Sequence, residues 1–183
     1  MAHLRLIPQP GPRVSSDEAC LDAFRRELSY IRRTFHRLGA PFSETEDLVQ
    51  ELFLVLRRTW DEYDQNRPLR PYLFGIAFRI ASGYRRKHAR EVTYGVFSVA
   101  DPRPGPDQLL ESNESRALLL EALDQIPLPR RAVLVMHELD HVPVTEVAAA
   151  LSIPRFTVYS RLRKARRELD KALRRIMRKV DES

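Results

Sequence analysis

The chain has 183 residues, 43% of them hydrophobic, and carries 31 Lys and Arg against 25 Asp and Glu, a net charge of +6. This composition is typical of one folded domain or two small ones. Charged residues make up 31% of the sequence, and no stretch approaches the roughly 18 consecutive apolar residues of a membrane span. Residues 1–13 lack the pattern of a secretory signal, so a cytoplasmic location is expected. The single cysteine, Cys20, excludes an intramolecular disulfide and a site with several thiolate ligands.

The net charge is distributed unevenly along the chain. Residues 44–64 contain seven acids and two bases, whereas residues 67–90 contain seven bases and no acid. Residues 155–179 contain eleven bases and two acids. The two basic blocks predict two surfaces that face a polyanion, and the acidic block predicts a separate surface for another partner. Ordinary solvated helix faces are the alternative explanation of these charge runs.

The first part of the chain predicts a flexible arm followed by two helices. Residues 1–14 hold three prolines and a glycine without periodicity, which is typical of a flexible N-terminal arm. Ser15 and Glu18 have the spacing of a capping box, and the apolar residues after them recur at steps of three and four until Gly39. Ser43 and Glu46 repeat this spacing and predict the start of a second helix.

The rest of the chain also predicts helices. Pro71 falls in the first turn of a third helix, which runs into the basic residues 85–90. Residues 91–113 include three prolines between Asp101 and Asp107 and are expected to form a linker. Four more helices are predicted, at about residues 118–126, 129–139, 144–151 and 154–179. The predicted fold class is all-α: two small helical domains, residues 15–90 and 114–180, joined by a Pro-rich linker.

The last two predicted helices have the proportions of a helix-turn-helix. A short helix leads through a tight turn at Ser152 and Ile153 into a helix entered through Pro154. Helical spacing places apolar side chains on one side of that helix and basic ones on the other, which suits a helix packed on its domain and lying in the major groove. The residues expected to contact bases or phosphates are Arg155, Phe156, Thr157, Ser160, Arg161, Arg163, Lys164 and Arg167. A basic surface helix without a DNA role is the alternative.

Four motifs occur in a fixed order along the chain. They are DLVQE at 47–51 followed by Leu-Phe, YLFGIA at 72–77, LPRR at 128–131 and IPRFTVYSR at 153–161. In this order and spacing, over roughly residues 18–175, the chain resembles the bacterial extracytoplasmic-function (ECF) RNA polymerase sigma factors of the sigma-70 family. The resemblance implies a sigma factor that binds core RNA polymerase and directs promoter-specific transcription initiation. It implies no catalytic activity and no cofactor or metal.

The resemblance also implies a different binding role for each of the two domains. The first domain would bind the β′ clamp of the polymerase and melt the minus-10 element, and the second would rest on the β flap and recognise minus-35. An anti-sigma factor is a further expected partner, because many members of the family are held inactive by one.

The resemblance places the functional residues of the first domain. The clamp contact falls on Asp47, Gln50 and Glu51, which share one helix face. The minus-10 contacts fall on the loop before the third helix and on that helix, at Tyr63, Asn66, Arg67, Arg79, Arg85, Arg86 and Lys87. Of the neighbouring aromatics, Trp60 and Phe74 are expected mainly in the core.

The chain departs from the family pattern at several positions. Arg79 replaces a common asparagine, Ser152 a turn glycine and Phe156 the glycine before Thr157, while Pro143 stands where a capping serine is frequent. Since Arg79 and Phe156 lie on the proposed reading surfaces, the promoter sequence cannot be predicted.

Parts of the sequence also fit three other functions. The stretch from His137 to His141 matches the H-E-x-x-H pattern of zinc proteases, but its second histidine falls at a predicted helix end and no third histidine follows. A conventional regulator that binds an operator as a homodimer would explain the helix-turn-helix but not the acidic helix. A module that mimics a sigma factor would not need basic reading faces.

Overall fold

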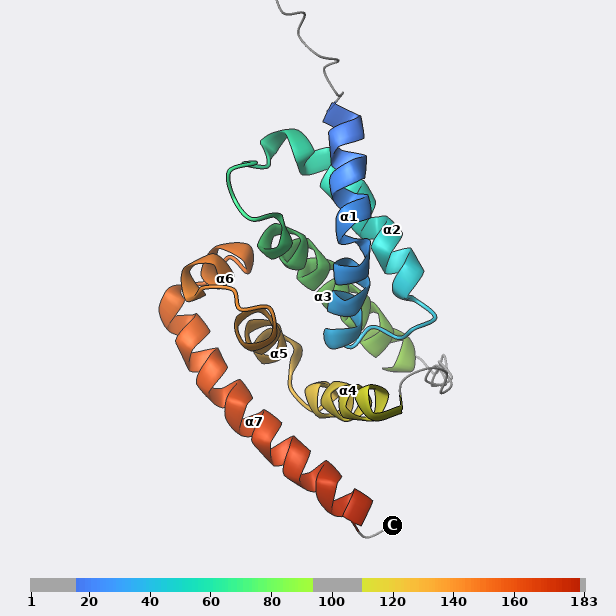
Figure 1. The fold of residues 1–183 in the computed structure, drawn as a ribbon, viewed down its shortest axis with the longest axis vertical. Helices are drawn as coiled ribbons and strands as arrows, with labels where there is room; N and C mark the ends of the chain where they lie inside the picture. The colour runs from blue at the N-terminus through green and yellow to red at the C-terminus, as the bar shows by residue number, and fades with distance from the viewer. Residues whose placement is uncertain (1–15, 94–109, 182–183) are drawn as a thin grey trace, which may run out of the picture.

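The computed structural model describes residues 16–93 and 110–181, and all regular structure within these ranges is helical (Figure 1). The prediction of an all-α fold is therefore confirmed. The proposed N-terminal arm lies outside the described residues. None of the described helices is both long and apolar enough to cross a membrane. The helices, in chain order, are α1 (Ser16–Arg37), α2 (Thr45–Thr59), the 3-10 turn η1 (Trp60–Glu62), α3 (Leu69–Thr93), α4 (Leu110–Asp124), α5 (Leu128–Leu134), the π-helical turn η2 (Val135–Leu139), α6 (Val144–Ala150) and α7 (Arg155–Asp181).

Helices α1, α2 and α3 pack against one another around a shared apolar core. The predicted helical spacing is correct for the later part of α1 and most of α2, where the apolar residues at steps of three and four are buried, whereas Leu21, Phe24, Leu28 and Val55 are half-buried. Trp60 is 7% exposed and Phe74 is fully buried, as expected for core aromatics. The most deeply buried residues of this half include Ile31, Phe35, Leu38, Leu52, Leu56, Leu73, Phe74 and Ile76.

Helix α2 begins two residues after Ser43, the capping residue that the sequence predicts. The N-cap residue is Glu44, which makes no side-chain capping hydrogen bond. The Glu46 carboxylate accepts two hydrogen bonds from the Arg32 guanidinium of α1, at 2.7 and 2.9 Å. The Thr45 hydroxyl donates to the Pro41 carbonyl at 2.8 Å and ties the preceding turn to the helix. The first predicted box includes Ser15, which lies outside the described residues.

The helix boundaries differ from the predicted ones around the expected linker and at the end of α5. Helix α3 continues to Thr93 and α4 begins at Leu110, so helices occupy both ends of the segment expected to be a linker. Residues 94–109 lie outside the described residues. The helix predicted over residues 129–139 is α-helical only to Leu134 and then changes to the π turn η2.

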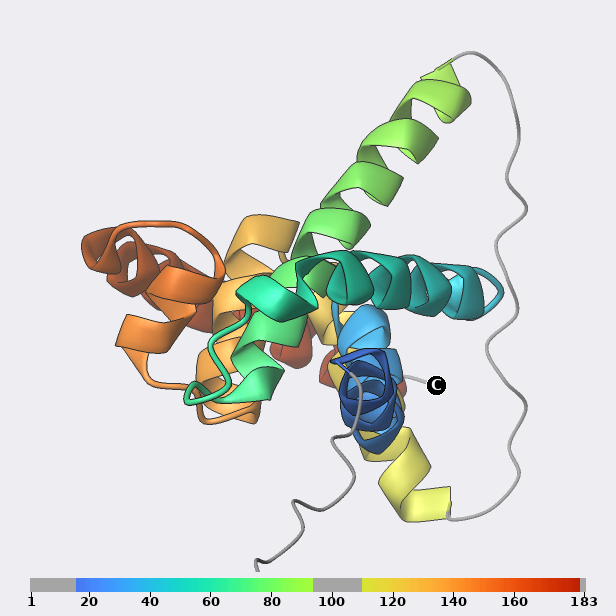
Figure 2. The same ribbon diagram turned by 90° about the horizontal axis from the view of Figure 1, so that it is seen from above.

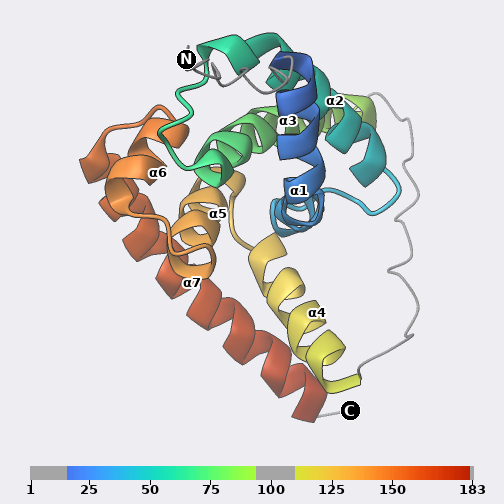
Figure 3. The same ribbon diagram turned by 45° about the horizontal axis from the view of Figure 1, so that its top comes forward.

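Helix α7 forms the outer edge of the second half and packs along α4 and α5 (Figure 3). Its buried side chains, Val158, Leu162, Ala165, Ala172 and Ile176, follow the predicted apolar stripe. The basic side chains of its described positions are exposed, except for Arg161, which is half-buried at the edge of the stripe. The order of short helix α6, connection and long helix α7 matches the expectation for residues 144–179.

The two halves pack against each other through α3 with α6 and α1 with α4, and one apolar core runs through both (Figures 1 and 2). Gly75 of α3 meets the backbone of α6 closely, because a Cβ placed on it would lie 2.5 Å from the Ala150 carbonyl oxygen. Asp140 joins the halves by accepting hydrogen bonds from the Tyr30 hydroxyl at 2.9 Å and the Arg37 guanidinium at 2.7 Å. Figure 2 shows the C-terminal part of α3 extending away from this body.

Candidate nucleic-acid interface

An acidic face runs along the exposed side of α2. Asp47, Gln50 and Glu51 are all exposed there, as the sequence predicted, and neither carboxylate forms an ion pair within the described part of the chain. Leu54 lies on the same face, four residues after Gln50, and is 51% exposed. Sequence reasoning missed Leu54, although a helical wheel of α2 would have placed it beside the acids. The face therefore combines negative charge with an apolar contact point.

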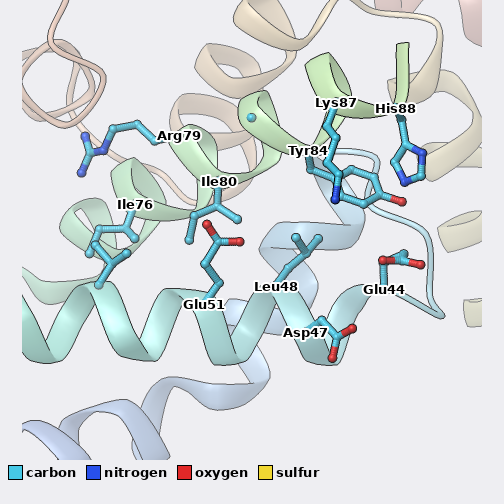
Figure 4. Close-up of a pocket in the computed structure, with 12 residues that line it drawn as sticks. Glu44, Asp47, Leu48, Glu51, Ile76, Arg79, Ile80, Tyr84, Lys87 and His88 are labelled. Atoms are coloured by element: carbon cyan, nitrogen blue, oxygen red, sulfur yellow. The ribbon is translucent and has the colours of Figure 1, made fainter. Parts of the chain in front are cut away.

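A groove of about 650 Å³ lies between the exposed sides of α2 and α3 (Figure 4). Its α2 side carries the acidic side chains Glu44, Asp47 and Glu51, and its α3 side carries the basic side chains Arg79, Lys87 and His88. Apolar side chains that include Leu48, Ile76 and Ile80 complete the lining. Two of the three predicted clamp residues and two of the predicted minus-10 residues thus face one groove. Gln50 does not line it.

The basic run at the end of α3 does not form one surface. Arg85, Arg86 and Lys87 are all exposed, but consecutive helical residues point about 100° apart. Lys87 faces the groove, whereas the Arg85 guanidinium approaches the turn after α1 and would lie 3.3 Å from a Cβ on Gly39. Arg79 and Arg86 are seven residues apart and share a face. The three basic side chains that are predicted to contact duplex phosphates therefore point in three different directions.

The side chains of the loop before α3 contact one another and their neighbours, which the sequence did not predict. The Tyr63 ring stacks between Trp60, at a centroid distance of 5.6 Å, and Tyr72, at 4.8 Å. Its hydroxyl donates to the Arg67 carbonyl, and burial raises its pKa. Asn66 is exposed but bonds to the Asp64 carboxylate through its backbone and side-chain nitrogens, at 3.0 and 3.1 Å. Tyr63 therefore has two aromatic neighbours, yet it is only half-buried and also lines a pocket.

Helix α6 lies beside this loop. A pocket of about 330 Å³ is lined on one side by Tyr63, Arg67 and Arg79 and on the other by α6 and the turn after it, including Glu146 and Ser152. The candidate minus-10 surface is therefore partly faced by the second half of the chain.

The N-terminal part of α7 presents most of its predicted DNA contacts outward. The exposed residues are Arg155, Phe156, Ser160, Arg163, Lys164 and Arg167. Thr157 and Arg161 are half-buried, because they lie toward the edge of the apolar stripe. Tyr159 was not predicted, yet it is 61% exposed and lies three residues after Phe156, which is 75% exposed. Aromatic residues favour core positions, so the residue type alone does not predict this exposure. The signal that could have found Tyr159 is its position off the apolar stripe of α7.

The stretch from His137 to His141 does not have the geometry of a zinc protease. His137 lies in the π turn and its ring Nδ1 is 3.0 Å from the Val142 carbonyl oxygen. His141 lies beyond the helix end in the left-handed region, with φ of 54°. The two histidines are not on one continuous α-helix, and the described residues contain no group of three side chains that could hold a metal ion.

Sequence comparisons identify both halves of the chain. Residues 21–91 match the family model "Sigma-70 region 2", and residues 116–169 match "Sigma-70, region 4". RNA polymerase sigma factor NccH of Alcaligenes xylosoxydans xylosoxydans is 27% identical over 79% of this chain and 79% of its own. ECF RNA polymerase sigma-E factor of Escherichia coli K12 is 25% identical over 76% of this chain and 78% of its own.

Two solved structures share the fold. Sigma factor RpoE in complex with the anti-sigma factor NepR from Bartonella quintana has a TM-score of 0.71 and 20% identity, covering 86% of this chain and 98% of RpoE. CnrH in complex with the cytosolic domain of CnrY has a TM-score of 0.59 and 23% identity, covering 86% and 88%. Regions 2 and 4 occur in order along the chain, and the relatives, which are named as RNA polymerase sigma factors, match it over most of their length. The chain therefore belongs to the extracytoplasmic-function sigma factors of the sigma-70 family, which bind core RNA polymerase and direct promoter-specific transcription initiation.

Proposed function

We propose that the sigma-factor activity of this chain is divided among three surfaces: the acidic face of α2 for the polymerase clamp, α3 with its preceding loop for minus-10, and the start of α7 for minus-35. The observation that carries this proposal is the sign of the exposed charge on each helix, which is acidic on α2 and basic on α3 and α7, with the α2 acids and the α3 bases on opposite sides of one groove. Opposite charges steer partners to different faces and repel wrong ones. The chain acts as a specificity subunit rather than as a catalyst, and it works in the cytoplasm with the polymerase.

The clamp contact is proposed on Asp47, Gln50 and Glu51, together with Leu54. The two carboxylates have no ion-pair partner in the described part of the chain, so a basic partner surface can pair with them without breaking an internal contact. Leu54 supplies an apolar contact beside them.

The minus-10 contact is proposed on Arg67, Asn66, Arg79 and Lys87, with Arg85 and Arg86 at its upstream edge. Arg79 lines both the α2–α3 groove and the pocket beside the loop, so a single strand could pass from one to the other over this residue. Tyr63 is proposed as a further minus-10 contact, because it lines the same pocket as Arg67 and Arg79.

The minus-35 contact is proposed on α7, with α6, the turn and α7 acting as a helix-turn-helix. The exposed side chains at the start of α7 point away from the core, which is the arrangement that a helix in the major groove requires. Arg163, Lys164 and Arg167 neutralise phosphates there. Arg155, Thr157, Ser160 and Arg161 are at or near the edge of the same surface.

An anti-sigma factor is proposed as a further partner. Both similar solved structures hold a sigma factor in complex with an anti-sigma factor, and this chain shares their fold over 86% of its length.

Charge reversal on α2 tests the proposal. Asp47→Lys and Glu51→Lys should each weaken binding to purified core polymerase by tenfold or more, because each places a like charge against a basic partner surface. Binding is measured by the mobility of fluorescently labelled sigma factor titrated with core polymerase, and helicity by circular dichroism.

Asp22→Lys is the matched control, because it makes the same charge change on an exposed residue of α1. Its affinity should stay within about twofold of the unmodified chain. Equal weakening by all three variants would show a general charge effect and remove the clamp assignment. Specific binding of a palindromic operator by a homodimer without polymerase would instead support the conventional regulator.

A further inference from the structure

Two aromatic side chains stand out on the outward face of α7. Phe156 is 75% exposed and Tyr159 is 61% exposed, the highest values among the large apolar side chains of the described residues. Large aromatic side chains are usually mostly buried, so an exposed pair on one helix points to a binding role. Residues three apart on a helix are neighbours on its surface, which makes the pair one continuous apolar patch. Neither ring contributes to the cores of the described structure.

Positive charge surrounds this aromatic patch. Arg163 and Lys164 follow it by one turn, Arg155 precedes it, and the first turn of α7 contains no acid. The first carboxylate on the helix is Glu168, which bonds to Arg130 of α5 at 2.8 Å. The natural partner of such a surface is therefore anionic and must also offer small apolar groups. The major groove of DNA meets both requirements, since phosphates border it and thymine presents its C5-methyl group inside it.

We propose that Phe156 and Tyr159 recognise thymine methyl groups in the minus-35 element, so that this sigma factor prefers thymines at that site. The inference rests on the proposed placement of α7 in the major groove. Two residues three apart are about 4.5 Å apart along the helix axis, and base pairs are stacked about 3.4 Å apart. The two rings therefore reach methyl groups on the same or on neighbouring base pairs. In the preferred element, the thymines whose methyl groups contribute to binding therefore lie within one or two base pairs of each other.

The size of the effect follows from the area that a methyl group hides from water. Removing one buried methyl costs about 0.8 kcal/mol, which corresponds to about a fourfold loss of affinity. Phosphate contacts by the surrounding arginines supply most of the remaining affinity and do not depend on the methyl group.

Deoxyuridine provides a direct test, because it pairs like thymine but lacks the methyl group. The full-length protein is reconstituted with core polymerase, and duplexes that bind it are selected from a pool with a randomised minus-35 region. In the selected duplex, each thymine is then replaced by deoxyuridine in turn and the affinity is measured. The unmodified holoenzyme should lose about fourfold at one or two neighbouring positions. Phe156→Ala and Tyr159→Ala should each bind the thymine duplex more weakly and lose the methyl effect at one position.

Arg167→Ala serves as the matched control on the same helix. It should weaken binding to the thymine and deoxyuridine duplexes equally and keep the fourfold difference between them, because it removes a phosphate contact. Circular dichroism should show equal helicity for all variants, since the three side chains are exposed.

The outcomes separate this inference from the proposed function. A holoenzyme that binds a selected duplex through Arg163 but ignores every methyl group would overturn the inference and leave the minus-35 assignment intact. Failure to select any minus-35 sequence would contradict the placement of α7 itself. Aromatic variants that bind the duplex normally but no longer bind an anti-sigma factor would show that the pair contacts protein instead.

Discussion

Ser152 adopts a backbone conformation that suits glycine better than serine. Its φ is 52°, in the left-handed region, where a side chain with a Cβ is strained. It occupies the turn between α6 and α7, and its backbone nitrogen donates to the Ala149 carbonyl at 3.2 Å. The turn forms with serine because the helices on both sides hold it in place.

Replacing this serine should stabilise the protein. Ser152→Gly is expected to raise the free energy of unfolding by about 0.5–1 kcal/mol, because glycine adopts a positive φ without strain. Chemical denaturation monitored by circular dichroism measures the change. Ser160→Gly is the control, since the same substitution within α7 should lower stability by a similar amount. A loss of stability at both positions would mean that the turn is not strained.

His36 links stability to pH. Burial lowers its pKa, and the positive charge of Arg116 on α4 adds to this effect, while the backbone near Ala40 and Glu46 of α2 oppose it. The folded chain therefore binds a proton at His36 less readily than the unfolded chain does.

Stability should fall as the pH drops below the free histidine value of about 6.5, by at most about 1.4 kcal/mol per pH unit. Thermal unfolding of the unmodified chain and of His36→Gln between pH 5 and pH 8 tests this. The variant should lose less stability over this range. Parallel curves for the two proteins would exclude His36 as the source.

At the scale of helices, Gly75 sets how closely α3 and α6 approach. A Cβ at this position would lie 2.5 Å from the Ala150 carbonyl oxygen, which belongs to backbone and cannot rotate away. Gly75→Ala is therefore expected to lower the free energy of unfolding by about 1–3 kcal/mol, because α6 must shift.

Gly83 provides the comparison for this prediction. It lies on the same helix with nothing within 4 Å of an added Cβ. Gly83→Ala should raise stability by up to about 1 kcal/mol through helix propensity alone. Chemical denaturation of both variants measures the difference, and equal shifts would show that α6 tolerates the added methyl group.

Much of the helix pattern could be predicted from the sequence, because burial of one face imposes a spacing of three and four. The apolar stripe of α7 and the acidic face of α2 are both correct on this ground. The end of α5 was not predicted, because the switch to a π turn depends on tertiary packing rather than on local pattern. The bond between Glu46 and Arg32 was not predicted, because it joins two different helices.

Contacts between the two halves could not be predicted at all. Arg131 is fully buried, and burial lowers its pKa although Asp124 accepts a hydrogen bond from it at 2.7 Å. Its guanidinium lies against Gly39, where an added Cβ would be only 2.3 Å from its Nη1 atom. The sequence marked Arg131 only as part of a motif, because charged residues are rarely buried and no periodicity relates it to Gly39.

For the whole molecule, Asp140 is a polar link between the halves. Its side chain is 9% exposed and bonds to Tyr30 and Arg37 of α1. Burial, together with the Asp140 charge, raises the pKa of Tyr30, so its hydroxyl remains a donor at neutral pH. Asp140→Ala leaves these donors without their acceptor, which costs about 1–3 kcal/mol for a buried group. The halves should separate more readily, with a larger radius of gyration in small-angle X-ray scattering.

Asp170→Ala is the control for Asp140→Ala. It removes the same charge from an exposed pair with Arg174 within α7 and touches no link between the halves. Promoter affinity of the holoenzyme should rise by up to about tenfold for Asp140→Ala beyond any rise for Asp170→Ala. Identical radii and affinities for the two variants would show that the link does not restrain the halves.

Helix α6 lies beside the loop that is proposed to contact minus-10, so the arrangement of the two halves affects promoter binding. The two promoter elements are centred about 25 base pairs apart, or about 85 Å of duplex. In the packed arrangement, Arg67 of the proposed minus-10 contact and Ser152 before α7 line the same pocket of about 330 Å³. If the two surfaces bind as proposed, we expect that the packed chain does not hold both elements at once. The measured dissociation constant is then the intrinsic one divided by the fraction of molecules that have separated. With 1% separated, promoter binding is weakened about a hundredfold, and any ligand selective for the packed arrangement lowers transcription without contacting a single DNA-binding residue.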